Sequence, residues 1–340
     1  MTELVNVAVA GATGAVGEAM CEILEQRDFP MGDLRLLASS RSAGKRVWFK
    51  DHYIRVECLD EFDFSETQIA LFSAGGEVSR VHAPRAAQSG AIVVDNTSHF
   101  RTHDTIPLVV PEVNQHRIAS GLKTGIIANP NCSTIQMVVA LKPIYDAVGI
   151  ERINVATYQA VSGAGSRGLK ELAVQTANIL NANEIEPEVA PVQIAFNAIP
   201  QIGEFKENGY TLEEMKMVWE TQKIFEDPGI KVNPTCVRIP VFFGHSEAVH
   251  IETREPLSVE DAHQLLRQAK NVELIDERTE GGYPTAVLHA AGKDPVYVGR
   301  VRKDISHDRG LSMWIVSDNV RKGAALNSIQ IAEEVASLIA

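Results

Sequence analysis

The sequence lacks the features that mark secreted and membrane proteins. Its four cysteines among 340 residues show no paired spacing, which argues against a disulfide framework and favours a reducing compartment. No apolar run approaches the ~20 residues that a transmembrane helix needs, and the first residues show no signal-peptide pattern. We therefore expect a cytoplasmic protein.

Positive charge is scarce as well. The sequence has 32 Lys and Arg against 44 Asp and Glu, a formal net charge of −12. This balance argues against nucleic acid or an anionic membrane as the main partner. An anionic substrate would have to be bound by a few local arginines and lysines. What the sequence does have is length and a 45% apolar share, enough for two domains that each bury a core.

The chain opens with a strand, a glycine-rich turn and a helix. Residues 4–10 form an apolar run, 11–17 read Gly-Ala-Thr-Gly-Ala-Val-Gly, and 18–26 continue with helical spacing. In this context the glycines let the backbone approach a pyrophosphate, and the helix N-terminus supplies N–H donors. The spacing differs from the commoner G-x-G-x-x-G. We predict a dinucleotide site mainly because the glycine-rich turn directly follows the first strand.

The residues after the second predicted strand, 34–38, indicate which dinucleotide is bound. Residues 39–42 read Ser-Ser-Arg-Ser, where an NAD site usually has an acidic residue for the ribose 2′-hydroxyl. Hydroxyls and the Arg41 guanidinium suit a 2′-phosphate instead, which favours NADP over NAD. The alternative interpretation is a solvated polar loop.

Further apolar strands at 69–72 and 91–95 alternate with a helical segment at 78–89. This order predicts an α/β fold whose N-terminal domain is a Rossmann-type, doubly wound parallel sheet. Ligands bind at the carboxyl ends of such strands, so residues 73–75 and 96–101 should line the cofactor crevice.

The pattern changes after residue 128. Strand-like runs at 153–161, 235–241 and 248–253 predict a second, α+β domain that binds substrate. The long irregular segment 181–201 within it suggests that it also forms the dimer interface. We place the NADP-binding domain at 1–128, with the final helix, 323–340, packing back on it, and the catalytic domain at 129–322. Residues 181–201 form an irregular segment too long for a turn, which would pack either on a partner subunit or within the domain.

The segment 129–134 reads Asn-Pro-Asn-Cys-Ser-Thr and joins a strand-like run to a helical pattern. Cys132 is therefore placed at a helix N-terminus, where free N–H groups and the helix dipole lower the pKa of a thiol. Its polar neighbours argue against an inert, buried cysteine. Cys21, Cys58 and Cys236 lie in apolar patterns and are interpreted as structural.

The most specific motifs occur in a fixed order along the chain. They are 11–17, Phe100-Arg101, 129–134, Gln159, Ser162-Gly163-Ala164-Gly165, Glu213-x-x-Lys216, Arg238 with His245 seven positions later, and Ser317-Asp318-Asn319. With these motifs the chain resembles the aspartate-semialdehyde dehydrogenase family over essentially its whole length. The resemblance implies an NADP-dependent homodimer without a metal site. It would convert L-4-aspartyl phosphate to L-aspartate 4-semialdehyde, in the biosynthesis of lysine (through diaminopimelate), threonine, methionine and isoleucine.

The resemblance also implies roles for individual residues. Cys132 would be the nucleophile that forms a thioester, His245 the acid/base group, and Gln159 the residue that orients the reacting group. Arg238 would bind the substrate carboxylate and Glu213 its ammonium, while Lys216, Arg101 and Asn131 would bind phosphate. The implied cofactor contacts are Gly11, Thr13, Gly14, Ala15, Val16, Gly17, Ser39, Arg41, Ser73, Gly75, Ser162, Gly163 and Asn319.

Four alternative interpretations remain open for these residues. Without the resemblance, Glu213 and Lys216 would be a solvated i,i+3 ion pair, and His245 an ordinary histidine in a surface turn. N-acetyl-γ-glutamyl-phosphate reductase shares the thioester chemistry, but its cysteine usually follows Pro-Gly, whereas Cys132 follows Pro-Asn. A non-catalytic paralogue that binds nucleotide would be expected to lose Cys132 or His245, and this chain retains both.

Overall fold

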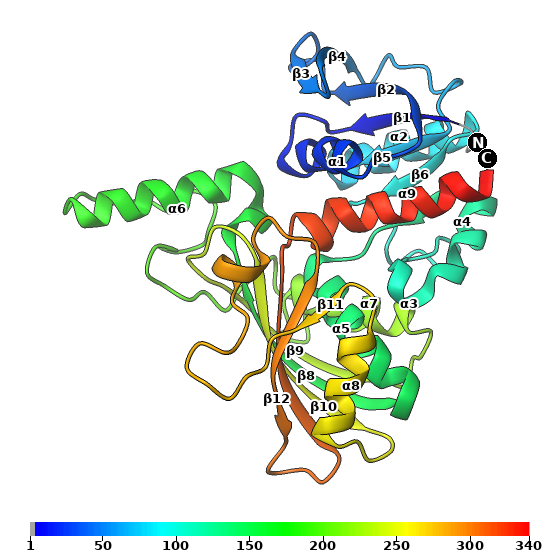
Figure 1. The fold of residues 1–340 in the computed structure, drawn as a ribbon. Coiled ribbons are helices and arrows are strands. Elements are labelled where there is room, and N and C mark those ends of the chain that lie inside the picture. The colour runs from blue at the N-terminus through cyan, green and yellow to red at the C-terminus, as the bar shows by residue number, and fades with distance from the viewer. Residues whose placement is uncertain (1–3, 340) are drawn as a thin grey trace. The chain divides into compact units, whose positions relative to one another are not determined.

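The computed structural model describes residues 4–339, which form two compact units. The first contains the described residues up to Pro130 and those from Ala324 onward, and the second is Asn131–Gly323 (Figure 1). The boundaries expected from the sequence lie after residues 128 and 322, whereas the chain passes between the units after Pro130 and after Gly323.

The first unit is a seven-stranded sheet with helices on its faces. Its strand order is β3-β4-β2-β1-β5-β6-β7, and all neighbours are parallel except β3 and β4. The elements are β1 (Val5–Ala10), α1 (Ala15–Gln26), β2 (Met31–Ala38), β3 (Arg46–Phe49), β4 (His52–Cys58), β5 (Ile69–Phe72), α2 (Gly76–Gln88), β6 (Ile92–Asp95), α3 (Pro111–Asn114), α4 (Ile118–Thr124), β7 (Ile126–Ala128) and α9 (Leu326–Ile339). The predicted doubly wound parallel sheet is confirmed.

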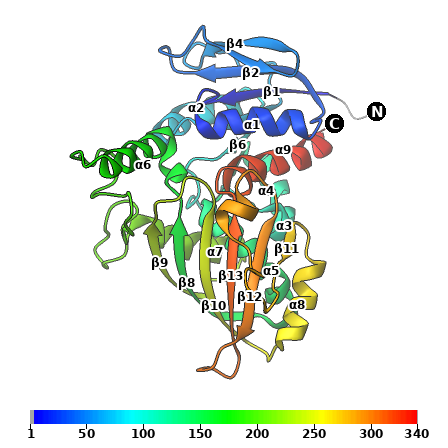
Figure 2. The same cartoon turned by 60° about the vertical axis from the view of Figure 1, so that its left-hand side comes forward.

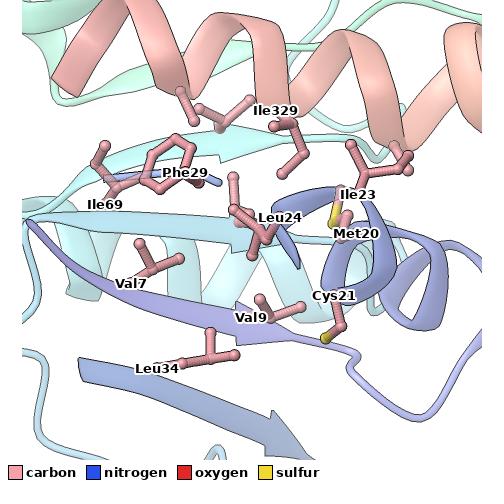
Figure 3. Packing of buried hydrophobic residues seen from close by; sticks show 14 of the residues in the cluster. Val7, Val9, Met20, Cys21, Ile23, Leu24, Phe29, Leu34, Ile69 and Ile329 are labelled. Atoms are coloured by element: carbon pink, nitrogen blue, oxygen red, sulfur yellow. The ribbon is translucent and has the colours of Figure 1, made fainter. Parts of the chain in front are cut away.

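The core of this unit explains why the chain returns to it at the end. Val7 and Val9 of β1 pack with Met20 and Leu24 of α1, and Ile329 of α9 belongs to the same buried cluster (Figure 3). Helices in a doubly wound fold must cover both faces of the sheet, because its central strands are apolar on both sides. Helix α9 therefore completes a core that the first 130 residues leave open.

The second unit is built on a mixed six-stranded sheet, in the order β11-β12-β13-β10-β8-β9 (Figure 2). Its elements are α5 (Cys132–Val148), β8 (Ile150–Gln159), α6 (Gly165–Leu180), α7 (Leu212–Ile224), β9 (Lys231–Arg238), β10 (His245–Thr253), α8 (Val259–Gln268), β11 (Val272–Leu274), β12 (Val296–Lys303) and β13 (Gly310–Ser317). The inner pairs β8–β10, β10–β13 and β12–β13 are antiparallel, whereas the outer strands β9 and β11 pair in parallel. The second, α+β unit is confirmed, although its sheet is mixed.

Short helices fill the connections between these elements. They are η1 (Gln115–Arg117), η2 (Val161–Ala164), η3 (Ala286–Ala290) and η4 (Arg321–Ala325). None of the helices among residues 4–339 combines the length and the apolar character needed to cross a membrane.

The irregular segment 181–201 is fixed by side chains of α6. Glu171 accepts hydrogen bonds from the backbone N–H groups of residues 188–190 at 2.7, 3.1 and 3.0 Å, and Gln175 accepts from Ile194 and Ala195. Ile194 then packs in a small buried cluster with Val161 and Leu172. Of the two alternatives, packing within the domain is observed, and Val192 and Phe196 remain exposed on the outer side.

Candidate functional site

Cys132 is the first residue of α5, as its sequence context predicts. Asn131 caps the helix with extended backbone angles, and its side-chain oxygen accepts from the N–H groups of Ser133 and Thr134 at 3.1 and 3.3 Å. This cap fixes the first turn, and the helix dipole there favours a negative charge. Cys132 is partly accessible, so a thiolate at this position can meet a substrate.

Two of the other cysteines differ sharply from Cys132. Cys21 and Cys236 are buried, and burial raises the pKa of Cys21 to about 12. Burial also raises the pKa of Cys236, with Glu213 adding to the effect. Both remain protonated thiols at neutral pH, which agrees with their interpretation as structural. Cys58, at the end of β4, is partly buried.

His245 is not in a surface turn, the alternative considered from the sequence, but is the first residue of β10 and fully buried. The backbone N–H of Ala160 donates to its Nδ1 at 3.1 Å, so the neutral ring carries its proton on Nε2. Burial and then the charge of Arg238 lower its pKa from 6.5 to about 3. The Nε2 atom has no hydrogen-bond partner among residues 4–339, and it is a donor available to a ligand.

Arg238 ends β9 close to His245. Its Nη1 donates to the carbonyl of Ala160 at 2.7 Å, and a Cβ placed on Gly163 would lie 2.9 Å from Nη1 and 3.6 Å from Nε2 of His245. Burial lowers the pKa of Arg238, and the charges of Glu213 and of a Cys132 thiolate oppose that effect. The guanidinium and the imidazole therefore border one space, which the missing side chain of Gly163 leaves open.

Glu213 connects the remaining predicted residues of this unit. It lies in the first turn of α7, where its Oε1 accepts from Asn131 at 2.8 Å and from Gln159 at 3.4 Å, while Lys216 donates to its Oε2 at 3.1 Å. Burial raises the pKa of Glu213, but Lys216, the Asn131 amide and Arg238 outweigh burial and hold the pKa below its usual value. The pair with Lys216 therefore belongs to a partly buried, charged network, unlike the solvated ion pair considered from sequence.

Asn319 follows β13 and joins two loops next to His245. Its Oδ1 accepts from the Ser162 hydroxyl and from the N–H of Gly244, both at 3.0 Å. With the oxygen engaged twice, the Nδ2 group is the part of Asn319 that can bind a ligand. Ser162, Gly163 and Asn319, which the sequence analysis assigns to the cofactor, thus lie around the same segment of the second unit.

Arg101 belongs to the first unit, in the loop after β6. Its Nε donates to the carbonyl of Thr97 at 3.1 Å and its Nη2 to that of Asn96 at 3.0 Å. Asp95 in turn accepts from the hydroxyls of Thr97 and Ser79 at 2.9 and 2.8 Å. The loop is therefore fixed by its own hydrogen bonds, and the Arg101 guanidinium is held at the carboxyl end of the sheet.

A cavity of about 410 Å³ in the first unit lies where the dinucleotide is expected. Six of the predicted cofactor residues line it, namely Gly11, Thr13, Gly14, Ser39, Arg41 and Ser73. Gly11 has a positive φ of 89°, and a Cβ on Gly17 would lie 2.1 Å from the carbonyl oxygen of Gly11. A side chain at either position would close this turn, so the residues present fit a bound pyrophosphate.

The other predicted cofactor residues of this unit lie near the turn. Ala15, Val16 and Gly17 form the start of α1, and Gly75 caps α2 with a φ of 101°. Sequence reasoning missed Asp60 and His82, which also line the cavity and whose carboxylate and imidazole lie 3.2 Å apart. No motif in the sequence marks either residue.

Two residues near Cys132 were also missed. A Cβ on Gly323 would lie 2.9 Å from the Cβ of Cys132, and Glu220 of α7 accepts from the backbone N–H of Asn131 at 2.5 Å. Glu220 is seven positions after Glu213, which places both on one face of α7. This spacing was the one signal in the sequence that could have indicated Glu220.

Comparison with known proteins agrees with this arrangement. Residues 6–121 match the family model for the semialdehyde dehydrogenase NAD binding domain, and residues 141–322 match that for the semialdehyde dehydrogenase dimerisation domain. Aspartate-semialdehyde dehydrogenase 2 of Vibrio cholerae is 61% identical over 98% of both chains.

Solved structures give the same result. The chain is similar to a crystal structure of aspartate semialdehyde dehydrogenase II complexed with ASA from Vibrio cholerae, with a TM-score of 0.96, 60% identity and 98% coverage of both chains. It is also similar to aspartate semialdehyde dehydrogenase with NADP from Candida albicans, with a TM-score of 0.76 and 27% identity, covering 99% of this chain and 100% of that one. The chain belongs to the aspartate-semialdehyde dehydrogenase family.

Proposed function

We propose that this protein reduces L-4-aspartyl phosphate to L-aspartate 4-semialdehyde with NADPH, releasing phosphate, as an oxidoreductase of amino-acid biosynthesis. The observation that carries the proposal is the position of Cys132 at the N-terminus of α5, in a unit that also holds a buried, neutral His245 beside Arg238. A thiolate nucleophile, a proton donor and a cation for a carboxylate are the groups that this reaction requires.

In the proposed reaction Cys132 attacks the acyl phosphate, phosphate leaves, and a thioester remains on the sulfur. NADPH supplies the hydride that reduces this thioester to the aldehyde level. His245 donates through Nε2 to the oxygen on which charge develops, and the N–H groups at the start of α5 stabilise the same oxygen. Collapse of the thiohemiacetal then frees the aldehyde and restores the Cys132 thiolate.

The substrate groups find partners in the same network. Arg238 offers a planar guanidinium to the α-carboxylate, and Gln159 orients the reacting carbonyl by hydrogen bonding. Glu213 would bind the α-ammonium. The ammonium would have to share the Glu213 carboxylate with Lys216, whose Nζ lies 3.1 Å from Oε2. Lys216, Asn131 and Arg101 would bind the phosphate, so displacement of Lys216 from Glu213 would accompany substrate binding.

NADP is the proposed dinucleotide. Ser39 and Arg41 line the cavity of the first unit, and a guanidinium with a hydroxyl suits a 2′-phosphate. The Candida albicans relative was solved with NADP, which supports the same choice. In the second unit, Nδ2 of Asn319 is the donor that we assign to the nicotinamide amide, with Ser162 and Gly163 beside it.

We also propose that the protein acts as a homodimer through its second unit. The matched family model describes this region as a dimerisation domain. Exposed apolar side chains occur on α6 and on the segment after it, including Leu180, Val192 and Phe196. A partner subunit would bury this apolar surface, and size-exclusion chromatography with light scattering measures the assembly directly.

The function is tested by following NADPH formation from L-aspartate 4-semialdehyde, NADP and phosphate. Turnover should require phosphate and should be abolished in Cys132→Ala, with NADPH binding retained. A wild-type protein that binds NADPH but does not turn over would be the non-catalytic paralogue. Turnover with N-acetyl-L-glutamate 5-semialdehyde in place of aspartate semialdehyde would indicate the reductase alternative.

A further inference from the structure

Two carboxylates of α7 hold the residue that precedes the nucleophile. Glu213 accepts from the side chain of Asn131 at 2.8 Å, and Glu220 accepts from its backbone N–H at 2.5 Å. The exposed fractions of Glu213 and Glu220 are 7% and 1%. Because they are seven positions apart, both project from one face of α7 toward the cap of α5.

Each contact restrains a different part of Asn131. The bond that the amide donates to Glu213 orients the side chain, whose oxygen caps α5 through Ser133 and Thr134. The bond that the backbone N–H donates to Glu220 fixes the peptide between Pro130 and Asn131, which is also the point where the chain enters the second unit. The direction from which the backbone reaches Cys132 is therefore set by Glu220.

We propose that Glu220 is a positioning residue, which orients the Cys132 thiolate for attack by holding the backbone N–H of Asn131. A carboxylate suits this task because a hydrogen bond from an N–H to a charged oxygen is about twice as strong as a neutral one. This inference rests on the proposed function, since orientation matters only if Cys132 reacts with a substrate.

The Glu220→Gln variant separates positioning from electrostatic activation. The Glu220 carboxyl is either neutral or negative, and a negative charge near Cys132 disfavours the thiolate, so the substitution cannot raise the pKa of the thiol through electrostatics. If Glu220 affected only the charge of the sulfur, Glu220→Gln would leave turnover unchanged or increase it. If Glu220 orients the sulfur, turnover falls although the thiolate forms at least as readily.

The test compares Glu220→Gln and Glu220→Asp with wild type. We expect kcat to fall roughly 10- to 100-fold in Glu220→Asp, because a displacement of about 1 Å at a reacting atom has effects of this size. In Glu220→Gln the fall should be smaller, because the amide oxygen still reaches the N–H of Asn131 but binds it more weakly than a charged oxygen does. The Asp variant keeps the charge but is one methylene too short for the 2.5 Å bond. The pH dependence of Cys132 alkylation by iodoacetamide should not move to higher pH in Glu220→Gln, and NADPH binding should be unchanged in both variants.

Glu214→Gln is the matched control. Glu214 is also a buried carboxylate of α7, but it accepts from the backbone N–H groups of Thr211 and Cys236 at 2.7 and 3.0 Å, away from Asn131. The Glu214→Gln variant should be less stable than wild type, because it weakens the cap of α7, and its kcat should equal that of wild type.

Wild-type kcat in either Glu220 variant would overturn the inference, as would an equal loss of kcat in Glu214→Gln. Failure of both Glu220 variants to bind NADPH would assign Glu220 to folding and also overturn it. Absence of wild-type turnover would reject the proposed function instead. In that case crystal structures of wild type and Glu220→Gln decide the inference, because an unmoved Cys132 sulfur in the variant would contradict it.

Discussion

The backbone N–H of Ala160 donates to Nδ1 of His245 at 3.1 Å, and this one bond decides which ring nitrogen can act on a ligand. Because Nδ1 is an acceptor here, the proton of the neutral imidazole is on Nε2. Nε2 has no hydrogen-bond partner within the described chain. His245 therefore enters the reaction as a neutral hydrogen-bond donor.

The low pKa of His245 predicts the pH dependence of turnover. With a folded pKa of about 3 instead of 6.5, the ring stays neutral through the whole working range. His245 should therefore contribute no ionisation near pH 6.5 to the profile of log kcat/KM against pH. The profile of His245→Gln should have the same shape as that of wild type in this range. That variant should lower kcat roughly 10²- to 10⁴-fold at every pH. A limb near 6.5 that disappears in the variant would contradict the neutral assignment.

The same shift affects stability, with a definite sign. Below pH 6.5 the unfolded chain binds a proton at His245, while the folded protein does not until pH approaches about 3. The free energy of unfolding should thus fall as pH drops through this window, and His245→Gln should weaken this dependence. Urea unfolding at pH 7.5 and pH 5 measures the difference, which should be smaller in the variant than in wild type.

Gly323→Ala should displace the nucleophile without touching the ligand sites of the first unit. A Cβ at this position would lie 2.9 Å from the Cβ and 3.3 Å from the Cα of Cys132, so one of the two backbones must move. We expect kcat to fall roughly 10- to 100-fold, with NADPH affinity preserved in a fluorescence titration. An alanine variant with normal kcat would show that the backbone at 323 can relax away from Cys132.

Arg41→Ala tests the choice of dinucleotide. If the guanidinium binds the 2′-phosphate, kcat/KM for NADP should fall about 10- to 100-fold, the range that corresponds to the loss of a charged hydrogen bond. The value for NAD should stay within experimental error, because NAD has no phosphate at this position. Equal losses for both dinucleotides would place Arg41 at another part of the cofactor.

Glu171→Gln should loosen the segment 188–190. Its carboxylate accepts three backbone N–H groups at 2.7 to 3.1 Å, and an amide can replace only one of its two acceptor oxygens. We expect a loss of about 1–3 kcal/mol in the free energy of unfolding, together with faster hydrogen exchange at these amides. Glu188→Gln, an exposed carboxylate in the same segment, serves as the control and should have little effect on either measurement.

Elements with a strong apolar period were predicted well, and elements without one were missed. The first strand, the Cys132 helix and the doubly wound parallel sheet of the first unit follow from periodicity and chain order, whereas the order of its strands comes only from the structure. The hairpin of β3 and β4 was not predicted, because its face carries the exposed Trp48 and Tyr53 and therefore lacks a regular apolar alternation. Strand β9 ends at Arg238, three residues earlier than predicted, because Pro240 lacks the N–H that a ladder needs.

The sequence by itself determined where the reactive groups stand along the chain, because a glycine turn, a cap and a nucleophile depend on neighbouring residues. It placed Cys132 at a helix N-terminus and Gly11, Ser39 and Arg41 near one another, and the structure shows both. Only the tertiary structure decided that His245 is buried with its proton on Nε2, and that Glu220 binds the backbone N–H of Asn131. Those properties arise from contacts between residues about 85 and 89 positions apart, which no local spacing encodes.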